Sequence, residues 1–210
     1  MCISCELIES RLFYVLLLLV QSTTQFDTST CGVRKGCVLN PPGCDPSSNC
    51  ISAFSYQVDG DSLLMEVSGA ATNGPKSYVA VGFSTDTFME NAAVTACSLL
   101  PDQPLQGRLS FNIGLTNKPV VADENLLNDT LKTLSAIYAN ERLSCVLRQK
   151  IIPPNGLTKT QVWPLNRAYY ILLALGPTRS TGNAIHSIEQ GPFYPYVSTS
   201  MENLQAYQSK

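Results

Sequence analysis

Cysteine is the residue type of this chain with the widest range of chemistry, since a thiol can react, bind a metal or form a disulfide. Cys2 and Cys5 lie at the N-terminus, and six more follow: Cys31, Cys37, Cys44, Cys50, Cys97 and Cys145. The first four of these have the spacing C-x5-C-x6-C-x5-C, which is wider than the C-x2–4-C pairs that zinc sites favour. In an exported chain an even number of cysteines predicts disulfides instead.

Two of these cysteines lie inside strand-like runs, AAVTACSLL for Cys97 and RLSCVLRQ for Cys145. We expect them to form one disulfide within or between sheets, in preference to two buried free thiols. Closing a loop of this length would contribute ~3–4 kcal/mol in the chain-entropy model. The sequence leaves open the pairing of the other four, Cys31, Cys37, Cys44 and Cys50.

The chain has one histidine, His186, in the loop-like stretch GPTRSTGNAIHSIEQGP. A single histidine excludes zinc and copper sites built from several, and the chain has no H-E-x-x-H motif. The G-x-S-x-G of serine hydrolases, the P-loop and the C-x-x-C-H of covalent haem attachment are also absent. A lone histidine in a loop is more often a solvated polar residue than a ligand.

Met89 is a second residue of interest, in the stretch FMENAAVTAC. It follows YVAVGFSTDT, which has the pattern of a strand running out into a polar loop. Methionine fills irregular gaps in cores, so a soft thioether at the edge of a loop has a structural interpretation as a hydrophobic plug.

The elements that must position these residues have the pattern of short strands. From residue 50, runs rich in β-branched and aromatic residues alternate with turn signals, among them the hairpin dipeptide Asp59-Gly60. The runs are ISAFSYQV, SLLMEVSGA, SYVAVGFS, AAVTACSLL, RLSFNIGL, PVVAD, LKTLSAIYANERLSCVLRQKII and AYYILLALG. This pattern predicts an all-β sandwich or barrel. One stretch, ENLLNDTLKTLSAIYANERL, also fits a helix.

The two ends of the chain differ from this pattern. Residues 1–22 are predicted to be a signal peptide, because the apolar run LFYVLLLLV is far shorter than the roughly 20 residues of a membrane span. We expect a Cys/Pro/Gly-rich segment over 23–50, the sandwich over 51–192 and a polar tail over 193–210. No other run approaches membrane length. Asn128 begins an Asn-Asp-Thr sequon, which in an exported chain predicts a glycosylated surface loop.

The composition is that of a globular protein, with 44% hydrophobic and 14% charged residues in a chain of 210. This length suits one domain with a single core. The formal net charge is −2 and the pI is about 5.4. Without a basic stripe, nucleic acid and anionic membrane surfaces are not expected partners.

Several stretches together resemble the DOMON domain, in particular the extracellular DOMON module of ferric-chelate reductase-like proteins. They are CGVRKGCVLNPPGC, YVAVGFSTDTFMENAAVTAC, RLSCVLRQ and AYYILLALGPT with a histidine downstream, and they cover about Cys31 to Pro192. The family pattern resembles Met-Gly-Asp where this chain has Met89-Glu90-Asn91. The resemblance implies an immunoglobulin-like antiparallel β-sandwich.

In redox-active relatives, the resemblance further implies a noncovalent b-type haem at one end of the sandwich, held between an axial methionine and an axial histidine. Carried over to this chain, Met89 and His186 take these two positions as ligands of the haem iron. The side chains that would form the walls of the haem site are Tyr78, Phe83, Phe88 and Trp163.

The function that the resemblance implies is electron transfer, since a thioether and an imidazole give a six-coordinate, low-spin iron with a raised potential. Ferric-chelate reductase-like proteins continue into a membrane cytochrome domain. This chain, with no expected span, would need a membrane cytochrome-type redox partner to take part in ferric reduction. The alternative is a non-redox DOMON module that binds a partner protein or a small ligand such as a sugar. We expect an electron carrier or binding module rather than a complete enzyme.

Overall fold

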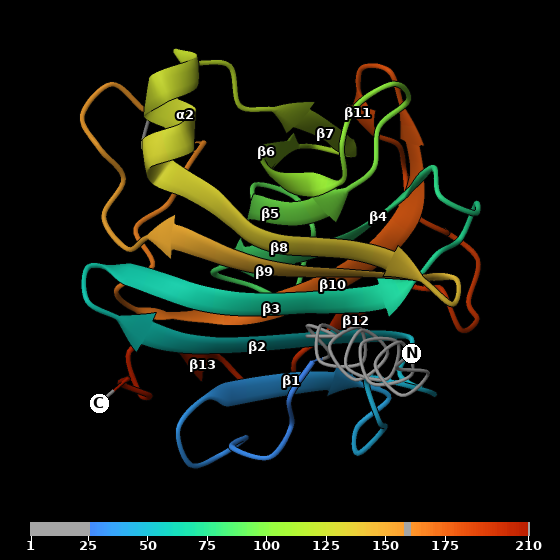
Figure 1. Cartoon of the computed structure of the whole chain (residues 1–210), viewed down its shortest axis with the longest axis horizontal. Coiled ribbons are helices and arrows are strands. Elements are labelled where there is room, and N and C mark those ends of the chain that lie inside the picture. Colours follow the sequence, from blue (N-terminus) through green and yellow to red (C-terminus); the bar gives the residue numbers. More distant parts are fainter. Residues whose placement is uncertain (1–25, 158–160, 210) are drawn as a thin grey trace, which may run out of the picture.

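The computed structural model describes residues 26–157 and 161–209, so the predicted signal peptide lies outside the described residues. Two antiparallel sheets pack face to face (Figure 1). One has five strands in the order β1-β2-β3-β9-β8. Their bounds are β1 Gly36–Asn40, β2 Ser52–Asp59, β3 Ser62–Ala70, β9 Arg142–Lys150 and β8 Leu131–Ala139. The all-β sandwich expected from the strand pattern is confirmed.

The second sheet has eight strands, with the order β11-β10-β4-β5-β6-β7 and with β12 and β13 also paired to β10. Their bounds are β4 Ser77–Ser84, β5 Ala93–Ser98, β6 Gln106–Ile113, β7 Thr116–Pro119, β10 Ala168–Arg179, β11 Gly182–Asn183, β12 Tyr196–Val197 and β13 Glu202–Asn203. The C-terminal segment after residue 192 therefore adds two strands to the sandwich, and the N-terminal segment before residue 51 adds β1. The domain boundaries at 50 and 192 remain predictions.

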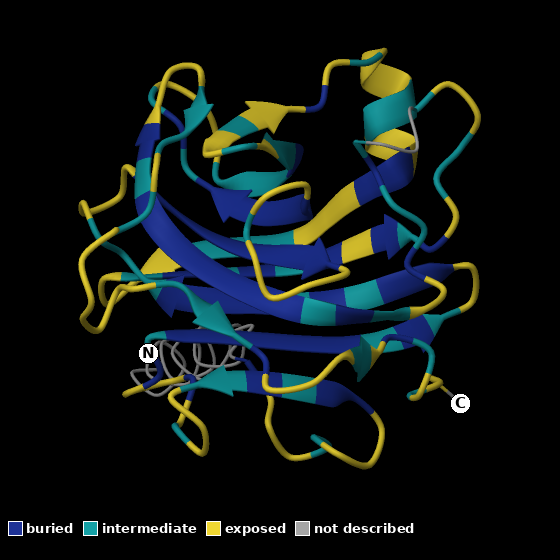
Figure 2. Ribbon diagram, turned by 180° about the vertical axis from the view of Figure 1, so that it is seen from behind, coloured by how far each residue is buried: buried dark blue, intermediate teal, exposed yellow. Residues whose placement is uncertain are grey.

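Strand β4 shows how the sequence divides its residues between the two faces of a sheet. Side chains alternate along a strand. Val79, Val81 and Phe83 accordingly lie in the core between the sheets, while Tyr78 and Ala80 belong to a separate apolar cluster on the opposite face. Every residue of β4 and of β5 is buried (Figure 2). Both faces of this part of the sheet are therefore covered by other parts of the chain.

The predicted disulfide between Cys97 and Cys145 is confirmed, with a Cα–Cα distance of 5.8 Å. Cys97 lies on β5 and Cys145 on β9, and these strands belong to different sheets. Both residues are buried in the core. The bond therefore joins the two layers through the middle of the sandwich.

The stretch that fitted both a helix and a strand contains one of each. Helix α2 spans Glu124–Thr130, and β8 follows it directly. The carboxylate of Asp123 caps the helix by accepting hydrogen bonds from the backbone N–H groups of Asn125 and Leu126. Asn128 is exposed on this helix, so the sequon lies on the surface, but the predicted loop is wrong. Among the described residues, no helix has the length and apolar character needed to cross a membrane.

The strand expected over PVVAD, residues 119–123, is also wrong. Strand β7 ends at Pro119, and the chain then leaves the sheet toward α2. Val120 is buried and its N–H still donates to the carbonyl of Leu109, but Val121 is exposed. The apolar character of this run therefore reflects one buried anchor rather than a strand.

The four N-terminal cysteines pair with their sequence neighbours, Cys31 with Cys37 and Cys44 with Cys50. Each bond closes a loop with a sequence separation of 6, and β1 lies between the two loops. The structure thus resolves the pairing that the sequence left open. The Cα–Cα distances are 5.5 and 5.0 Å.

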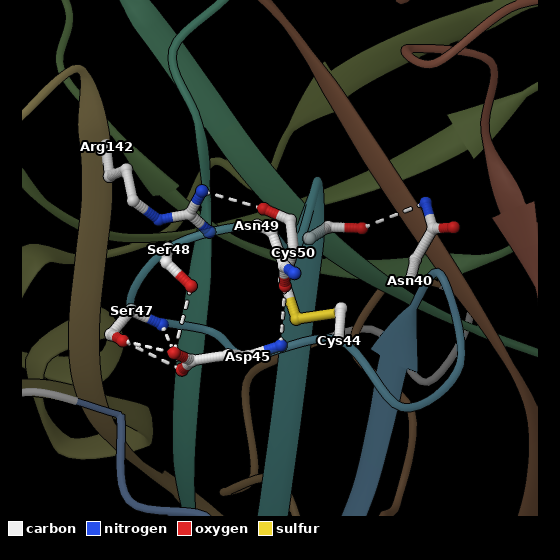
Figure 3. The surroundings of a disulfide bond; sticks show 9 residues. Asn40, Cys44, Asp45, Ser47, Ser48, Asn49, Cys50 and Arg142 are labelled. Atoms are coloured by element: carbon white, nitrogen blue, oxygen red, sulfur yellow. Dashed lines mark hydrogen bonds between the residues drawn. A yellow bond between two sulfur atoms is a disulfide. The ribbon is translucent and has the colours of Figure 1, made fainter.

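Figure 3 shows how the second loop is held to the sheet. Within the loop, the carboxylate of Asp45 accepts hydrogen bonds from the backbone and side chain of Ser47, and these bonds hold the pKa of Asp45 below its usual value. At the start of β9, Nη1 of Arg142 donates to the carbonyl oxygen of Cys50 at 2.7 Å. Burial lowers the pKa of Arg142.

The N-terminal loop is attached to the outer face of the five-stranded sheet through a buried lysine. Lys35 is 7% exposed, and its Nζ lies 2.5 Å from Oε2 of Glu66 on β3 and 3.8 Å from the exposed Asp27. The ammonium also lies 5.5 Å from the centre of the Phe26 ring. Ser55 of β2 donates to the same Glu66 oxygen.

We expect Glu66→Gln to release this attachment. The substitution keeps the shape of the side chain but leaves the buried Lys35 charge without its close partner, which costs about 3 kcal/mol for a buried pair. Hydrogen exchange followed by mass spectrometry should then show faster exchange in residues 26–37. Asp27→Asn is the control, because the exposed Asp27 contributes at most about 1 kcal/mol. Unchanged protection in Glu66→Gln would contradict the role given to this pair.

Candidate functional site

A pocket of about 620 Å³ lies against the outer face of the eight-stranded sheet. Its floor is made by residues of β4, β5 and β10 whose side chains are mostly small: Ala80, Gly82, Val94, Leu172 and Ala174. The hairpin of β6 and β7 forms one wall, and the chain from Arg179 to Ile188 forms the other. Because the floor residues are short, the two walls stand above the sheet and enclose a hollow with an apolar base.

Close packing between neighbouring strands also favours small residues on the outer face of the eight-stranded sheet. A Cβ added to Gly82 would lie 3.2 Å from Cβ of Leu172, on the neighbouring strand. A side chain at Gly82 would therefore crowd Leu172 and fill part of the pocket floor.

Met89 enters the pocket from the loop between β4 and β5. It is half-buried and packs against the apolar cluster on the outer face of the sheet, which includes Tyr78 and Ala174. Within its loop, the carboxylate of Asp86 accepts a hydrogen bond from the N–H of Phe88 at 2.8 Å. The side chain of Asn112, on the β6–β7 wall, donates to the carbonyl oxygen of Met89 at 2.6 Å.

The two residues after Met89 differ from the family pattern, yet they fit the turn. Asn91 has a φ of 58°, a left-handed conformation that asparagine tolerates better than most residues. Glu90 does not have a positive φ, so the turn does not require a glycine at this position. The turn is therefore compatible with both substitutions.

His186 lines the same pocket from the wall formed by residues 179–188, in the segment after β11. Its Nδ1 lies 2.8 Å from the carbonyl oxygen of Ser187. Because a carbonyl oxygen can only accept, Nδ1 must donate, and in the neutral ring Nε2 then keeps its lone pair. A backbone carbonyl on the far nitrogen is the usual partner of a metal-ligating histidine.

The segment that carries His186 is fixed to the sheet by Tyr78. The hydroxyl of Tyr78 donates to the carbonyl oxygen of Ala184 at 3.0 Å, and the N–H of Ala184 donates to the carbonyl of Pro177 at 3.0 Å. Burial raises the pKa of Tyr78, so its hydroxyl remains a donor at physiological pH.

Of the four side chains expected to form walls, only Tyr78 lines the pocket. Phe83 points into the core between the sheets because it falls on the inner face of β4, and Trp163 packs against that same core. Phe88 is 70% exposed, outside the pocket. The pocket also lies on the face of a sheet, whereas the resemblance implied a site at one end of the sandwich.

No motif of the sequence predicts the residues on the two walls, since they meet only through the folding of distant segments. They include Asn112, Leu115, Lys118, Arg179, Ile185 and Ile188. Three of them are exposed apolar side chains, Leu115, Ile185 and Ile188. Within the described ranges, no group of three or more His, Cys, Asp or Glu side chains has the arrangement of a metal site.

Comparison with known proteins gives a family and several relatives. The family model of the DOMON domain matches residues 48–176. Ferric-chelate reductase 1 of Mus musculus is 30% identical over 175 residues, which cover 83% of this chain and 27% of that protein. The human DOMON domain-containing protein FRRS1L is 29% identical over 163 residues, or 77% of this chain and 51% of that protein.

The chain thus spans about a quarter of the length of ferric-chelate reductase 1 and about half that of FRRS1L. Among solved structures, the cytochrome domain of Myriococcum thermophilum cellobiose dehydrogenase aligns with a TM-score of 0.43 and 10% identity, over 80% of this chain and 77% of that domain. A similarity of this size is too low to transfer individual residues.

Proposed function

Since the chain belongs to the DOMON domain family, we propose that it binds haem b in the pocket on its outer sheet face, with Met89 and His186 as the axial ligands. One observation carries the proposal. The single histidine of the chain and a half-buried methionine, 97 positions apart in the sequence, both line one pocket.

The residues of the pocket fit such a group in three respects. The hydrogen bond to Ser187 leaves Nε2 of His186 available as a donor to iron. The hydrogen bond from Asn112 ties the backbone of Met89 to the β6–β7 wall, and the Met89 side chain lines the pocket. The base of small apolar residues suits the apolar part of the ring, and ligand pockets are typically apolar with a few placed polar groups.

Haem held between a thioether and an imidazole supplies a one-electron couple with a raised potential. The protein's own part is to orient the two ligands, to exclude water from the sheet face and to set the polarity around them. We propose that the chain acts in this way as an exported electron carrier. Its relatives' names suggest ferric reduction as the use, and we propose that a membrane cytochrome-type partner takes part in it.

Titration of the purified protein with haem tests the proposal. We expect uptake with a low-spin, six-coordinate b-type absorption spectrum. Ala174→Trp should abolish or strongly weaken this uptake, because it places an indole on the pocket floor. Ala139→Trp makes the same change at an exposed position of β8 and should leave uptake unchanged.

A folded protein that takes up no haem would contradict the proposal and would favour the non-redox alternative, in which the module binds a partner protein or a small ligand such as a sugar. Uptake by Ala174→Trp equal to that of Ala139→Trp would show that haem binds elsewhere on the surface. Thermal unfolding of both variants reports whether each remains folded.

A further inference from the structure

The charged residues of the pocket are of one sign. Lys118, on β7, and Arg179, at the end of β10, line opposite walls, and no aspartate or glutamate lines the pocket. The chain as a whole has a net charge of −2, so this local excess of positive charge does not follow from its composition.

Within residues 26–157 and 161–209, neither Lys118 nor Arg179 has an ion-pair partner. Among the described residues, the ion pairs of the protein involve Lys35, Arg148 and Lys150, and none of these reaches the pocket. Lys118 and Arg179 are both exposed at the rim. Their walls approach each other where β7 lies near β11. A ligand seated on the apolar floor would therefore meet a positive rim at the pocket mouth.

We infer that Lys118 and Arg179 bind the carboxylates of the pocket's ligand, which under the proposed function are the two propionates of haem. The inference rests on that function for the identity of the ligand. The match between ligand and pocket does not depend on that identity. Any ligand with an apolar body and carboxylates at one edge would suit the apolar floor and the positive rim. The guanidinium of Arg179 can bind a carboxylate through two parallel hydrogen bonds, whereas Lys118 acts as a point charge.

The arrangement also predicts the orientation of the ligand. Propionates at the rim place the charged edge toward solvent and the apolar edge against Ala80 and Val94. The exposed apolar side chains of Leu115 and Ile185 would then cover the faces of the ring at the mouth.

The test compares haem with its dimethyl ester, in which both carboxylates are blocked, by absorption titration of the full chain. We expect the double variant Lys118→Gln, Arg179→Gln to bind haem about tenfold more weakly than the wild type. This difference in affinity should be larger at low salt, where charges are screened less. The dimethyl ester should bind the wild type about tenfold more weakly than haem does, and the double variant should bind it as well as the wild type.

The control is Arg34→Gln, Lys132→Gln, which makes the same change of charge at exposed positions outside the pocket and should bind haem like the wild type. Equal affinity of the wild type for haem and for its dimethyl ester, with no effect of the Lys118 and Arg179 substitutions, would overturn this inference while leaving the proposed function intact. Failure of every variant and of the wild type to take up either compound would overturn both.

Discussion

Replacing both Cys97 and Cys145 by alanine is expected to lower the free energy of unfolding by about 4 kcal/mol, the largest loss expected from removing one of the three disulfides among the described residues. The disulfide has a sequence separation of 48, and the chain-entropy model assigns about that value to a loop of this length. The melting temperature should fall by roughly 10 °C. Thermal unfolding followed by circular dichroism measures the loss.

The matched control is the double alanine variant of Cys31 and Cys37. This pair closes a loop with a separation of 6, for which the same model gives about 2 kcal/mol. An equal loss for both variants would contradict the view that the bridge between β5 and β9 is the main covalent support of the sandwich. Alanine is preferred to serine, since both central cysteines are buried and a hydroxyl there would lack a partner.

Removing the proposed axial ligands should have a large effect on both the strength of haem binding and the spectrum. We expect His186→Ala to weaken binding by more than the ~10–100-fold that loss of an outer-shell partner costs at a metal site. Met89→Ala should keep part of the affinity but convert the spectrum from low-spin to high-spin, because one axial position is then left to water. Absorption titration measures both effects.

Added imidazole should restore the low-spin spectrum of His186→Ala, which separates loss of a ligand from loss of the fold. Met201→Ala is the control for Met89, as Met201 is 44% exposed and does not line the pocket. Low-spin spectra in both His186→Ala and Met89→Ala without added imidazole would remove these residues from the site.

The sequence predicted the fold well because a sandwich rests on a pattern with a period of two residues. The runs SLLMEVSGA and SYVAVGFS became β3 and β4 with their apolar faces inward, and the hairpin at Asp59-Gly60 lies where its dipeptide predicted. The predictions that were wrong concern single short segments. Helix α2 is only seven residues long and depends on the cap at Asp123, which is too short a signal to outweigh the strand pattern around it.

The candidate site could be predicted only in part. The sequence singled out Met89 and His186, and the structure brings both to one pocket. The residues that form the pocket walls could not be predicted from the sequence. Two properties decide them: the face of the strand that a residue occupies, and which strands are neighbours in the sheet. Phe83 was expected at the pocket but lies on the inner face of β4, in the core. Arg179 was missed for the second reason, since its strand β10 is a neighbour of β4 although the two strands are far apart in the sequence.

That neighbouring position of β4 and β10 has a consequence for the time course of folding. The two strands pair Ser77 with Pro177, so the central ladder of the larger sheet joins residues a hundred positions apart. Sandwiches dominated by such distant pairings fold in milliseconds to seconds, slower than helical domains. The loops closed by Cys31–Cys37 and Cys44–Cys50 need no distant partner. We therefore expect these two bonds to form early, and the Cys97–Cys145 bond to form only once the two sheets have met.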